Sequence, residues 1–242
     1  TAYDYWTAQL LNSTPIDGIL VGDSAAKIMH GYPDTTAATV ETMEIHVQAV
    51  SRGAPDKFIV GDLPFMSYRK GIPAAVEASE RLIRAGANAV KMEGARGNEA
   101  IITHLVESGI PVMGHVGLQP QSVNGVGGYR VQGRDNADEI LADAVTLEAC
   151  GCFSIVIELV TSDVAATITE RLTIPTIGIG AGPATDGQIL VLQDLAGFNP
   201  GFSAKFVRAF GDGAGMLQDA MAAFDNAVKS GDYPSDDESY LP

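Results

Sequence analysis

Cysteine is scarce in this chain of 242 residues, which has only Cys150 and Cys152, separated by one glycine. Two thiols cannot complete a four-sulfur zinc site, and a reducing cytosol would keep them unpaired. A redox role for the pair remains an alternative to the packing role that we favour. The sequence therefore excludes a disulfide scaffold, and a chain of this length can bury a large core without one.

Basic residues are also few, with 15 lysines and arginines against 30 acidic residues and a formal net charge of −15. Such a surface repels nucleic-acid phosphate and anionic lipid, so we expect neither nucleic acid nor a membrane as a partner. No apolar run approaches the roughly 20 residues that span a bilayer. We therefore expect a cytoplasmic protein. Because the chain starts abruptly in what looks like a structured segment, we also expect an N-terminal lead-in to be missing.

What the chain does contain is a recurring unit, in which an amphipathic stretch ends at a glycine and a short β-branched run usually follows. Four such stretches end at Gly53, Gly86, Gly109 and Gly151, where glycine would supply a left-handed cap. Runs that are apolar on both faces suit a parallel sheet covered by helices. The predicted strands are residues 1–3, 18–21, 57–60, 89–92, 111–113, 154–157, 174–177 and 188–192.

About eight strands that alternate with helices predict an α/β protein, a single (β/α)8 TIM barrel over residues 1–242. A doubly wound open sheet is the alternative arrangement. After Ala214 the pattern predicts one more helix, through Met221, Phe224 and Val228, followed by a polar end.

Polar side chains stand at the carboxyl ends of successive predicted strands: Asp4, Asp23 with Ser24, Asp62, Lys91 with Glu93, His115 and Glu158. In a barrel these ends share one mouth, where barrel enzymes place their chemistry. Asp23, Asp62 and Glu93 offer hard oxygen ligands that suit Mg²⁺ together with the carboxylate and ketone oxygens of a 2-oxo acid. Lys91 points to the same side of its strand as Glu93 and could hold the anionic end of that substrate. A salt-bridge network at the mouth is the alternative interpretation. His115 would bond a substrate oxygen or satisfy a loop carbonyl.

Two glycine-rich stretches were candidates for binding loops. Residues 178–182, Gly-Ile-Gly-Ala-Gly, follow a strand as a dinucleotide loop would, but Pro183 stands where the third glycine is required. A tight turn that lets the backbone approach a ligand remains. Residues 125–129, Gly-Val-Gly-Gly-Tyr, are predicted to form a mobile loop over the mouth. Because no nucleophile elbow or phosphate-loop lysine motif occurs, the sequence favours metal and acid–base chemistry.

Eight short motifs occur in order along nearly the whole chain. They are residues 1–4 Thr-Ala-Tyr-Asp, 21–24 Val-Gly-Asp-Ser, 62–68 Asp-Leu-Pro-Phe-Met-Ser-Tyr, 90–94 Val-Lys-Met-Glu-Gly, 115–121 His-Val-Gly-Leu-Gln-Pro-Gln, 127–133 Gly-Gly-Tyr-Arg-Val-Gln-Gly, 174–182 Ile-Pro-Thr-Ile-Gly-Ile-Gly-Ala-Gly and 186–188 Asp-Gly-Gln. Some are weak individually, but together they are highly specific. With them the chain resembles the ketopantoate hydroxymethyltransferase family, also called 3-methyl-2-oxobutanoate hydroxymethyltransferases.

This resemblance implies a barrel of the phosphoenolpyruvate-mutase-like kind that transfers a one-carbon unit from 5,10-methylenetetrahydrofolate to 3-methyl-2-oxobutanoate. The product would be 2-dehydropantoate, on the route to pantothenate and coenzyme A, formed through an Mg-stabilised enolate. The resemblance also implies a large homo-oligomer, often a decamer. Carried over by motif, the Mg²⁺ site would be Asp23, Asp62 and Glu93, the oxo-acid site Asp23, Ser24, Asp62 and Lys91 with His115 beside it, and the proton acceptor Glu158.

Two other functions remain open at this point. A lyase or mutase of the same barrel superfamily, which cleaves a C–C or C–P bond in a 2-oxo acid, needs the same Mg²⁺ site but no folate. The motif at residues 127–133 argues against it. A non-catalytic barrel that only binds the oxo acid is the third hypothesis, and the presence of Glu158 with all three carboxylates argues against that one.

Overall fold

The computed structural model describes residues 1–122, 125, 128, 130–199, 201–202 and 204–240. Most of the loop predicted at residues 125–129 lies outside this description. The chain divides into two compact units, Thr1–Ile189 and Leu190–Pro242. The first unit contains every residue that the sequence assigns to a site.

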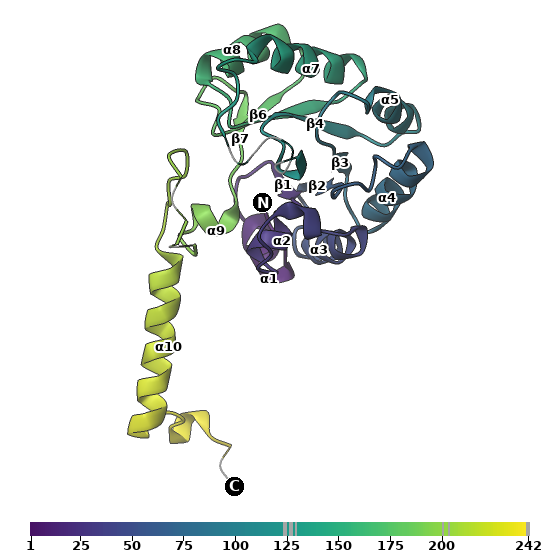
Figure 1. The fold of residues 1–242 in the computed structure, drawn as a ribbon. Coiled ribbons are helices and arrows are strands. Elements are labelled where there is room, and N and C mark those ends of the chain that lie inside the picture. Colours follow the sequence, from purple (N-terminus) through teal and green to yellow (C-terminus); the bar gives the residue numbers. More distant parts are fainter. Residues whose placement is uncertain (123–124, 126–127, 129, 200, 203, 241–242) are drawn as a thin grey trace. The chain divides into compact units, whose positions relative to one another are not determined.

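A parallel sheet of seven strands forms the centre of the first unit, and its order follows the chain from β1 to β7. Figure 1 shows the strands curving around a common centre, with the longer helices on the outside. This consecutive order excludes the doubly wound alternative, in which the strand order reverses within the sheet. The strands are β1 Gly18–Val21, β2 Phe58–Asp62, β3 Ala89–Lys91, β4 Val112–Gly117, β5 Ser154–Glu158, β6 Thr176–Ile179 and β7 Gly187–Gln188.

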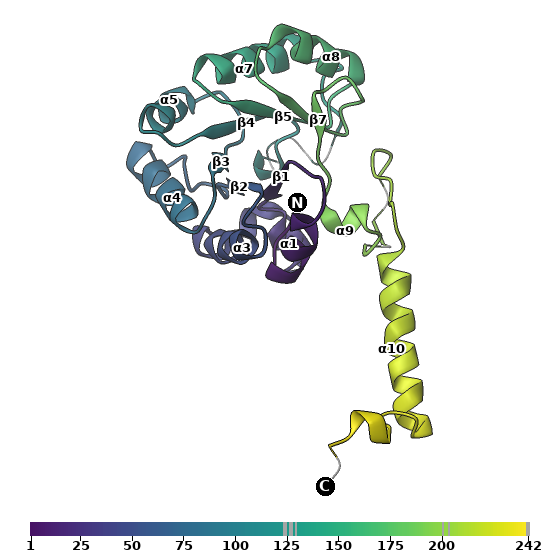
Figure 2. The same ribbon diagram turned by 180° about the vertical axis from the view of Figure 1, so that it is seen from behind.

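Helices follow the strands and cover the outer face of the sheet, an arrangement that is seen from both sides in Figures 1 and 2. Because these helices bury one apolar stripe each against strands that are themselves apolar, a continuous core forms between the two layers. Short 3₁₀ turns, η1 Thr35–Ala37 and η2 Pro120–Ser122, lie after β1 and β4. The helices are α1 Tyr5–Asn12, α2 Ala25–Ile28, α3 Val40–Gly53, α4 Ile72–Arg84, α5 Glu99–Glu107, α7 Ala137–Ala149 and α8 Ser162–Arg171.

Three of the four predicted glycine caps are confirmed, because Gly86, Gly109 and Gly151 have φ angles of 112°, 88° and 95° just after their helices. The prediction for Gly53 is wrong. This glycine remains helical as the last residue of α3, and it is needed for packing. A Cβ added there would collide with the carbonyl oxygen of Tyr5 and lie 2.8 Å from the Cβ of Ala8, so α3 and α1 can approach this closely only over glycine.

Both ends of the predicted strand set need correction. Residues 1–3 form no strand, although the Ala2 N–H donates to the carbonyl oxygen of Leu20 in β1 over 3.3 Å. The predicted last strand is reduced to β7, since α9, Leu192–Leu195, begins where the sequence predicted that the strand would end. Asp4 does not reach a strand end either. Its Oδ1 accepts the Thr7 N–H over 2.9 Å and thereby caps α1.

The two cysteines are packing residues, as favoured from the sequence. Both are free thiols, Cys152 is buried, and Cys150 packs against the same core. Burial raises the pKa of the Cys152 thiol to about 12, with Cys150 adding to the shift. A thiol so difficult to ionise is a poor nucleophile.

The second unit contains α9, the predicted final helix α10, Gly213–Ser230, and a 3₁₀ turn η3, Asp236–Glu238. Gly231 ends α10 with a φ of 82°. α10 buries Gly213 alone, which makes it unlike the longer helices around the sheet. Five of its large apolar side chains are exposed to solvent: Met216, Leu217, Met221, Phe224 and Val228. No helix in the described part of the chain is both long and apolar enough to cross a membrane.

Candidate active site

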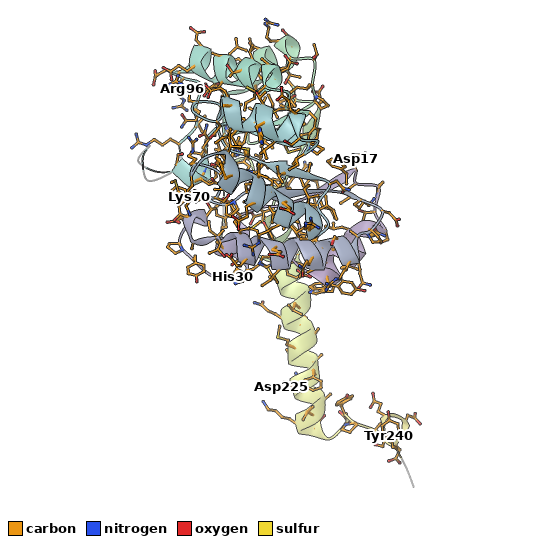
Figure 3. All side chains as sticks on the ribbon, turned by 90° about the vertical axis from the view of Figure 1, so that its right-hand side faces the viewer. Asp17, His30, Lys70, Arg96, Asp225 and Tyr240 are labelled. Atoms are coloured by element: carbon orange, nitrogen blue, oxygen red, sulfur yellow. The ribbon has the colours of Figure 1, made fainter. Side chains whose placement is uncertain are left out.

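The site residues of the sequence lie around the carboxyl ends of β1 to β5. Asp62 ends β2 and is paired in register with Lys91, which ends β3, while Glu158 ends β5 opposite Gly117 of β4. Figure 3 shows which side of this unit the carboxyl ends of the strands face. Lys70 and Arg96, from the loops after β2 and β3, lie at that side, and Asp17, just before β1, lies at the opposite side. A parallel sheet therefore brings these polar ends to one edge.

Lys91 is the centre of the buried cluster. Its Nζ lies 2.8 Å from Oδ1 of Asp62, 3.3 Å from Nδ1 of His115 and 3.8 Å from Oε1 of Glu93. Burial opposes the charge on Lys91, but the carboxylates of Asp62, Glu93 and Asp23 outweigh it and raise the pKa of Lys91. The salt-bridge network that the sequence left as an alternative is thus present, and all five side chains are at most 4% exposed.

Each of the three carboxylates has one oxygen held by a nitrogen donor of the protein. Oδ2 of Asp62 accepts the backbone N–H of Asp23 over 3.1 Å. Oδ2 of Asp23 accepts the side-chain amide of Gln121 over 2.9 Å, and Oε2 of Glu93 accepts the backbone N–H of Gln121 over 3.0 Å. The second oxygens of Asp62 and Glu93 face Lys91, at 2.8 and 3.8 Å from its Nζ.

The acidic side chains of this cluster outnumber the basic ones, because Asp23, Asp62 and Glu93, with Glu158 at the edge, surround Lys91 and His115. Burial, followed by the nearby Asp62, raises the pKa of Asp23 well above its usual range. Burial also raises the pKa of Asp62, although Lys91 opposes the shift. The pKa of Glu93 is instead lowered, since His115 and Lys91 outweigh its burial. A buried excess of negative charge is stabilised by an added cation.

The donor set fits Mg²⁺ in chemistry and in charge. Asp23, Asp62 and Glu93 provide hard carboxylate oxygens, which Mg²⁺ prefers, and the charge imbalance favours a divalent cation. Among the described residues, no group of three or more His, Cys, Asp and Glu side chains is already arranged to hold a metal ion. A bound cation would therefore draw the second oxygens of these carboxylates closer together while the first oxygens stay on the donors named above.

His115 connects this cluster to Glu158. Its Nδ1 lies 3.6 Å from Oε1 of Glu93, and its Nε2 lies 3.3 Å from Oε2 of Glu158, whose side chain is partly open to solvent. Burial and the charge of Lys91 oppose protonation, but Glu158 and Glu93 outweigh them and raise the pKa of His115 to about 9. At neutral pH a positively charged imidazole therefore stands between two carboxylates.

Ser24 lies beside this cluster, immediately after Asp23 and just before α2. Its Oγ and the hydroxyl of Tyr3 are 2.8 Å apart, within hydrogen-bond distance. Tyr3 is buried, and its carbonyl oxygen accepts Nδ1 of His46 over 2.5 Å. The structure thus places every sequence-predicted site residue at one edge of the sheet, with Ser24 at the margin of the group.

Three further residues contribute to this site, and neither their residue types nor their spacing in the sequence indicates a role. Gln121 lies in η2 and contacts two of the carboxylates. Tyr68 donates its hydroxyl to Oε1 of Gln121 over 2.8 Å, and Asn98 donates to the backbone carbonyls of Glu93 and Gly94 over 3.0 and 2.9 Å. Gln121 and Tyr68 end two of the motifs quoted above, which was the only signal available for them.

The glycine-rich stretch after β6 is the tight turn that the sequence predicted. Gly180 and Gly182 have φ angles of 64° and 80°, which a residue with a side chain rarely adopts. A Cβ at Gly182 would lie 2.6 Å from the Cβ of Ser162. The backbone therefore turns closely against the start of α8, and whether a ligand approaches it stays a prediction.

Several solved structures have a similar fold. A phosphoenolpyruvate phosphomutase from Streptomyces platensis subsp. rosaceus superposes with a TM-score of 0.64 at 14% identity, covering 95% of this chain and 82% of that one. A phosphonopyruvate hydrolase solved with oxalate and Mg²⁺ gives 0.60 at 15% identity, covering 98% and 86%. A 2,3-dimethylmalate lyase, described as a PEP mutase/isocitrate lyase superfamily member, gives 0.56 at 18% identity, covering 94% and 79%. At these identities the likeness concerns the fold.

Sequence relatives are much closer. The 3-methyl-2-oxobutanoate hydroxymethyltransferase of Coxiella burnetii (strain Dugway 5J108-111) is 52% identical over 237 residues, which cover 97% of this chain and 89% of that protein. The enzyme of the same name from Francisella tularensis subsp. tularensis (strain FSC 198) is 49% identical over 242 residues, covering 99% and 92%. The family model described as ketopantoate hydroxymethyltransferase matches residues 1–236. The chain therefore belongs to the ketopantoate hydroxymethyltransferase family.

Proposed function

We propose that this enzyme transfers a one-carbon unit from 5,10-methylenetetrahydrofolate to 3-methyl-2-oxobutanoate and forms 2-dehydropantoate for pantothenate and coenzyme A synthesis. The observation that carries the proposal is the buried group of Asp23, Asp62, Lys91 and Glu93, with Glu158 at its edge. An acceptor oxo acid needs an anion-binding group, a site for stabilising negative charge on its ketone oxygen and a base for its C3 proton. This group of residues contains all three.

Asp23, Asp62 and Glu93 would hold Mg²⁺. When bound, the ion would supply positive charge that stabilises the negative charge developing on the ketone oxygen. The phosphonopyruvate hydrolase of similar fold was solved with Mg²⁺ and oxalate, a small dicarboxylate, which supports this part of the proposal. Lys91 is held in its charged state by three carboxylates and would orient the substrate carboxylate, with Ser24 offering its hydroxyl at the margin.

Glu158 would accept the proton from C3 of the oxo acid, and C3 would form the new C–C bond to the one-carbon unit. Both bonds from this carbon to the folate nitrogens break, water supplies the hydroxyl oxygen and the two nitrogen-bound protons, and tetrahydrofolate leaves. The side chain of Glu158 is the most exposed carboxylate of the group, so it can reach a bound substrate. The charged His115 at 3.3 Å would orient the side chain of Glu158. A positioned base of this kind contributes typically 10²–10⁴-fold to the rate.

The remaining parts of the proposal concern the whole protein. We propose a closed (β/α)8 barrel of the phosphoenolpyruvate-mutase-like kind, supported by the seven consecutive parallel strands and by the structural neighbours. We also propose a cytoplasmic homo-oligomer, a decamer by family resemblance. The exposed apolar side chains of α10 support an assembly, because such a surface is usually covered by a partner.

Product formation from 3-methyl-2-oxobutanoate, with methylenetetrahydrofolate and Mg²⁺ each omitted in turn, tests this function. Dependence of product on both components is the expected result. The second candidate is a lyase or mutase acting on a 2-oxo acid, and the structural neighbours favour it, since they include a lyase and a mutase. Mg²⁺-dependent turnover of other 2-oxo acids without folate, together with no transfer product, would support that candidate instead.

A further inference from the structure

Gln121 is hydrogen-bonded to two of the three buried carboxylates, Asp23 and Glu93. It is buried in η2, the turn that follows β4, and it belongs to no strand. Its side-chain Nε2 donates to Oδ2 of Asp23 and to the carbonyl oxygen of Leu63, each over 2.9 Å. Its Oε1 accepts the hydroxyl of Tyr68 over 2.8 Å.

These contacts fix the orientation of the Gln121 amide. If the amide nitrogen and oxygen were exchanged, Oε1 of Gln121 would face Oδ2 of Asp23 and the carbonyl oxygen of Leu63. Both of these atoms are acceptors, so two buried oxygens would lose their donor. The tyrosine hydroxyl could then no longer donate to the amide oxygen. Asp23 is therefore always offered a donor at Oδ2.

The backbone of the same residue acts on a second carboxylate. The N–H of Gln121 donates to Oε2 of Glu93 over 3.0 Å. Oε1 of Glu93 faces Lys91 and His115 at 3.8 and 3.6 Å, toward the centre of the cluster. One residue on one turn thus occupies one oxygen of each carboxylate and leaves Oδ1 of Asp23 and Oε1 of Glu93 for a cation.

We propose that Gln121 is a positioning residue for the divalent cation, which fixes the rotation of Asp23 through its side chain and that of Glu93 through its backbone. The proposal rests on the Mg²⁺ site of the proposed function. Tyr68 has an indirect part, since it holds the amide in the orientation that Asp23 needs. Removal of such supporting partners typically lowers metal affinity 10–100-fold.

Isothermal titration of the intact protein with Mg²⁺ alone tests the proposal without any turnover. We expect Gln121→Met, which keeps the length of the side chain and the backbone N–H, to raise the Kd for Mg²⁺ about 10–100-fold. Tyr68→Phe, which leaves the amide in place but removes the hydroxyl that orients it, should raise the Kd about 10-fold, the lower end of that range. Gln119→Met, in the same loop, is the matched control and should bind Mg²⁺ like the wild type.

A lower affinity in both test variants, with their thermal unfolding midpoints close to that of Gln119→Met, would support positioning. If Gln121→Met fails to fold, Tyr68→Phe decides: lower affinity supports the proposal, and unchanged affinity overturns it. Wild-type protein and Gln121→Met that bind Mg²⁺ equally would overturn the positioning role alone. Wild-type protein that binds no Mg²⁺ would overturn it together with the metal site of the proposed function.

Discussion

At the scale of single residues, Glu158 gives the most direct test of the proposed proton transfer. Glu158→Gln keeps the size of the side chain but removes its ability to accept a proton, so we expect turnover to fall about 10²–10⁴-fold. Affinity for the oxo acid should change only a few-fold, because Lys91 and the carboxylates remain. Steady-state kinetics and a binding titration with 3-methyl-2-oxobutanoate measure the two effects. Glu170→Gln, on the exposed side of α8, is the control.

Near-normal turnover of Glu158→Gln would remove this residue from the proton transfer. A large loss of oxo-acid affinity would instead mean that Glu158 holds the substrate. The two outcomes are separable because Glu158 faces the cluster through His115, whereas Lys91 contacts Asp62 directly.

His46 gives a second prediction at this scale, which concerns stability. Burial lowers the pKa of His46, with His30 acting in the same direction, so the unfolded chain binds a proton at this residue more readily than the folded one. A basic group with a depressed folded pKa therefore makes the protein less stable as pH falls below its unfolded value of about 6.5. We expect His46→Gln to show a shallower loss of unfolding free energy than the wild type between pH 7.5 and 5.

Urea unfolding of both proteins at several pH values in this window measures the difference. His104→Gln, at an exposed position of α5, controls for the removal of a histidine that is not buried. Parallel curves for wild type and His46→Gln would show that burial of this imidazole contributes nothing to the pH dependence.

At the scale of elements, the contact between α1 and α3 depends on Gly53. Gly53→Ala should improve helix propensity by up to about 1 kcal/mol. The added methyl group would meet Tyr5 and Ala8, and overpacking of this kind typically costs about 1–3 kcal/mol. We expect a net loss of unfolding free energy, measured by urea denaturation. Arg52→Ala, the exposed neighbour in α3, should be nearly neutral, and a Gly53→Ala protein as stable as the wild type would refute the packing role.

Most elements could be predicted because one periodicity dominated each of them. The apolar run of β5 lies within one residue of its predicted bounds, and α3 ends at Gly53, where the amphipathic stretch was predicted to end. β4 was underestimated, since it continues through Gly114, His115 and Gly117, residue types that carry no strand signal. The strand predicted at residues 1–3 is wrong, because a strand also needs a neighbouring strand with which it forms a regular hydrogen-bond ladder. Residues 1–3 form no such ladder with β1.

The candidate site could be predicted where its residues end strands and could not be predicted where they lie in turns. Asp62, Lys91 and Glu158 end strands, so the rule that carboxyl ends of parallel strands converge was sufficient to group them. Gln121 does not end a strand. It lies in a turn and contacts Asp23, Leu63 and Glu93, which follow β1, β2 and β3. The alternation of helices and strands along the chain says nothing about how such a turn lies.

At the scale of the whole molecule, the fold specifies the reaction less narrowly than the sequence family does. The neighbours at 14–18% identity include a mutase, a hydrolase and a lyase, so a sheet of this kind is compatible with several reactions. The relatives at 49% and 52% identity share one name and almost the full length of this chain. The sequence family and the polar residues at the carboxyl edge of the sheet therefore support the proposed activity. The architecture places those residues close to one another.

The proposed homo-oligomer can be tested at the exposed apolar side chains of α10. Met221, Phe224 and Val228 lie three and four residues apart, so they share one face of the helix, and two of them are more than half exposed. Covering such a face with another copy would remove apolar surface from water, and a charge placed there would oppose it. We expect Phe224→Asp to lower the molar mass measured by light scattering after gel filtration, whereas Asp225→Asn, at the next position of the helix, should leave it unchanged. An unaltered mass for Phe224→Asp would place the contacts between copies elsewhere.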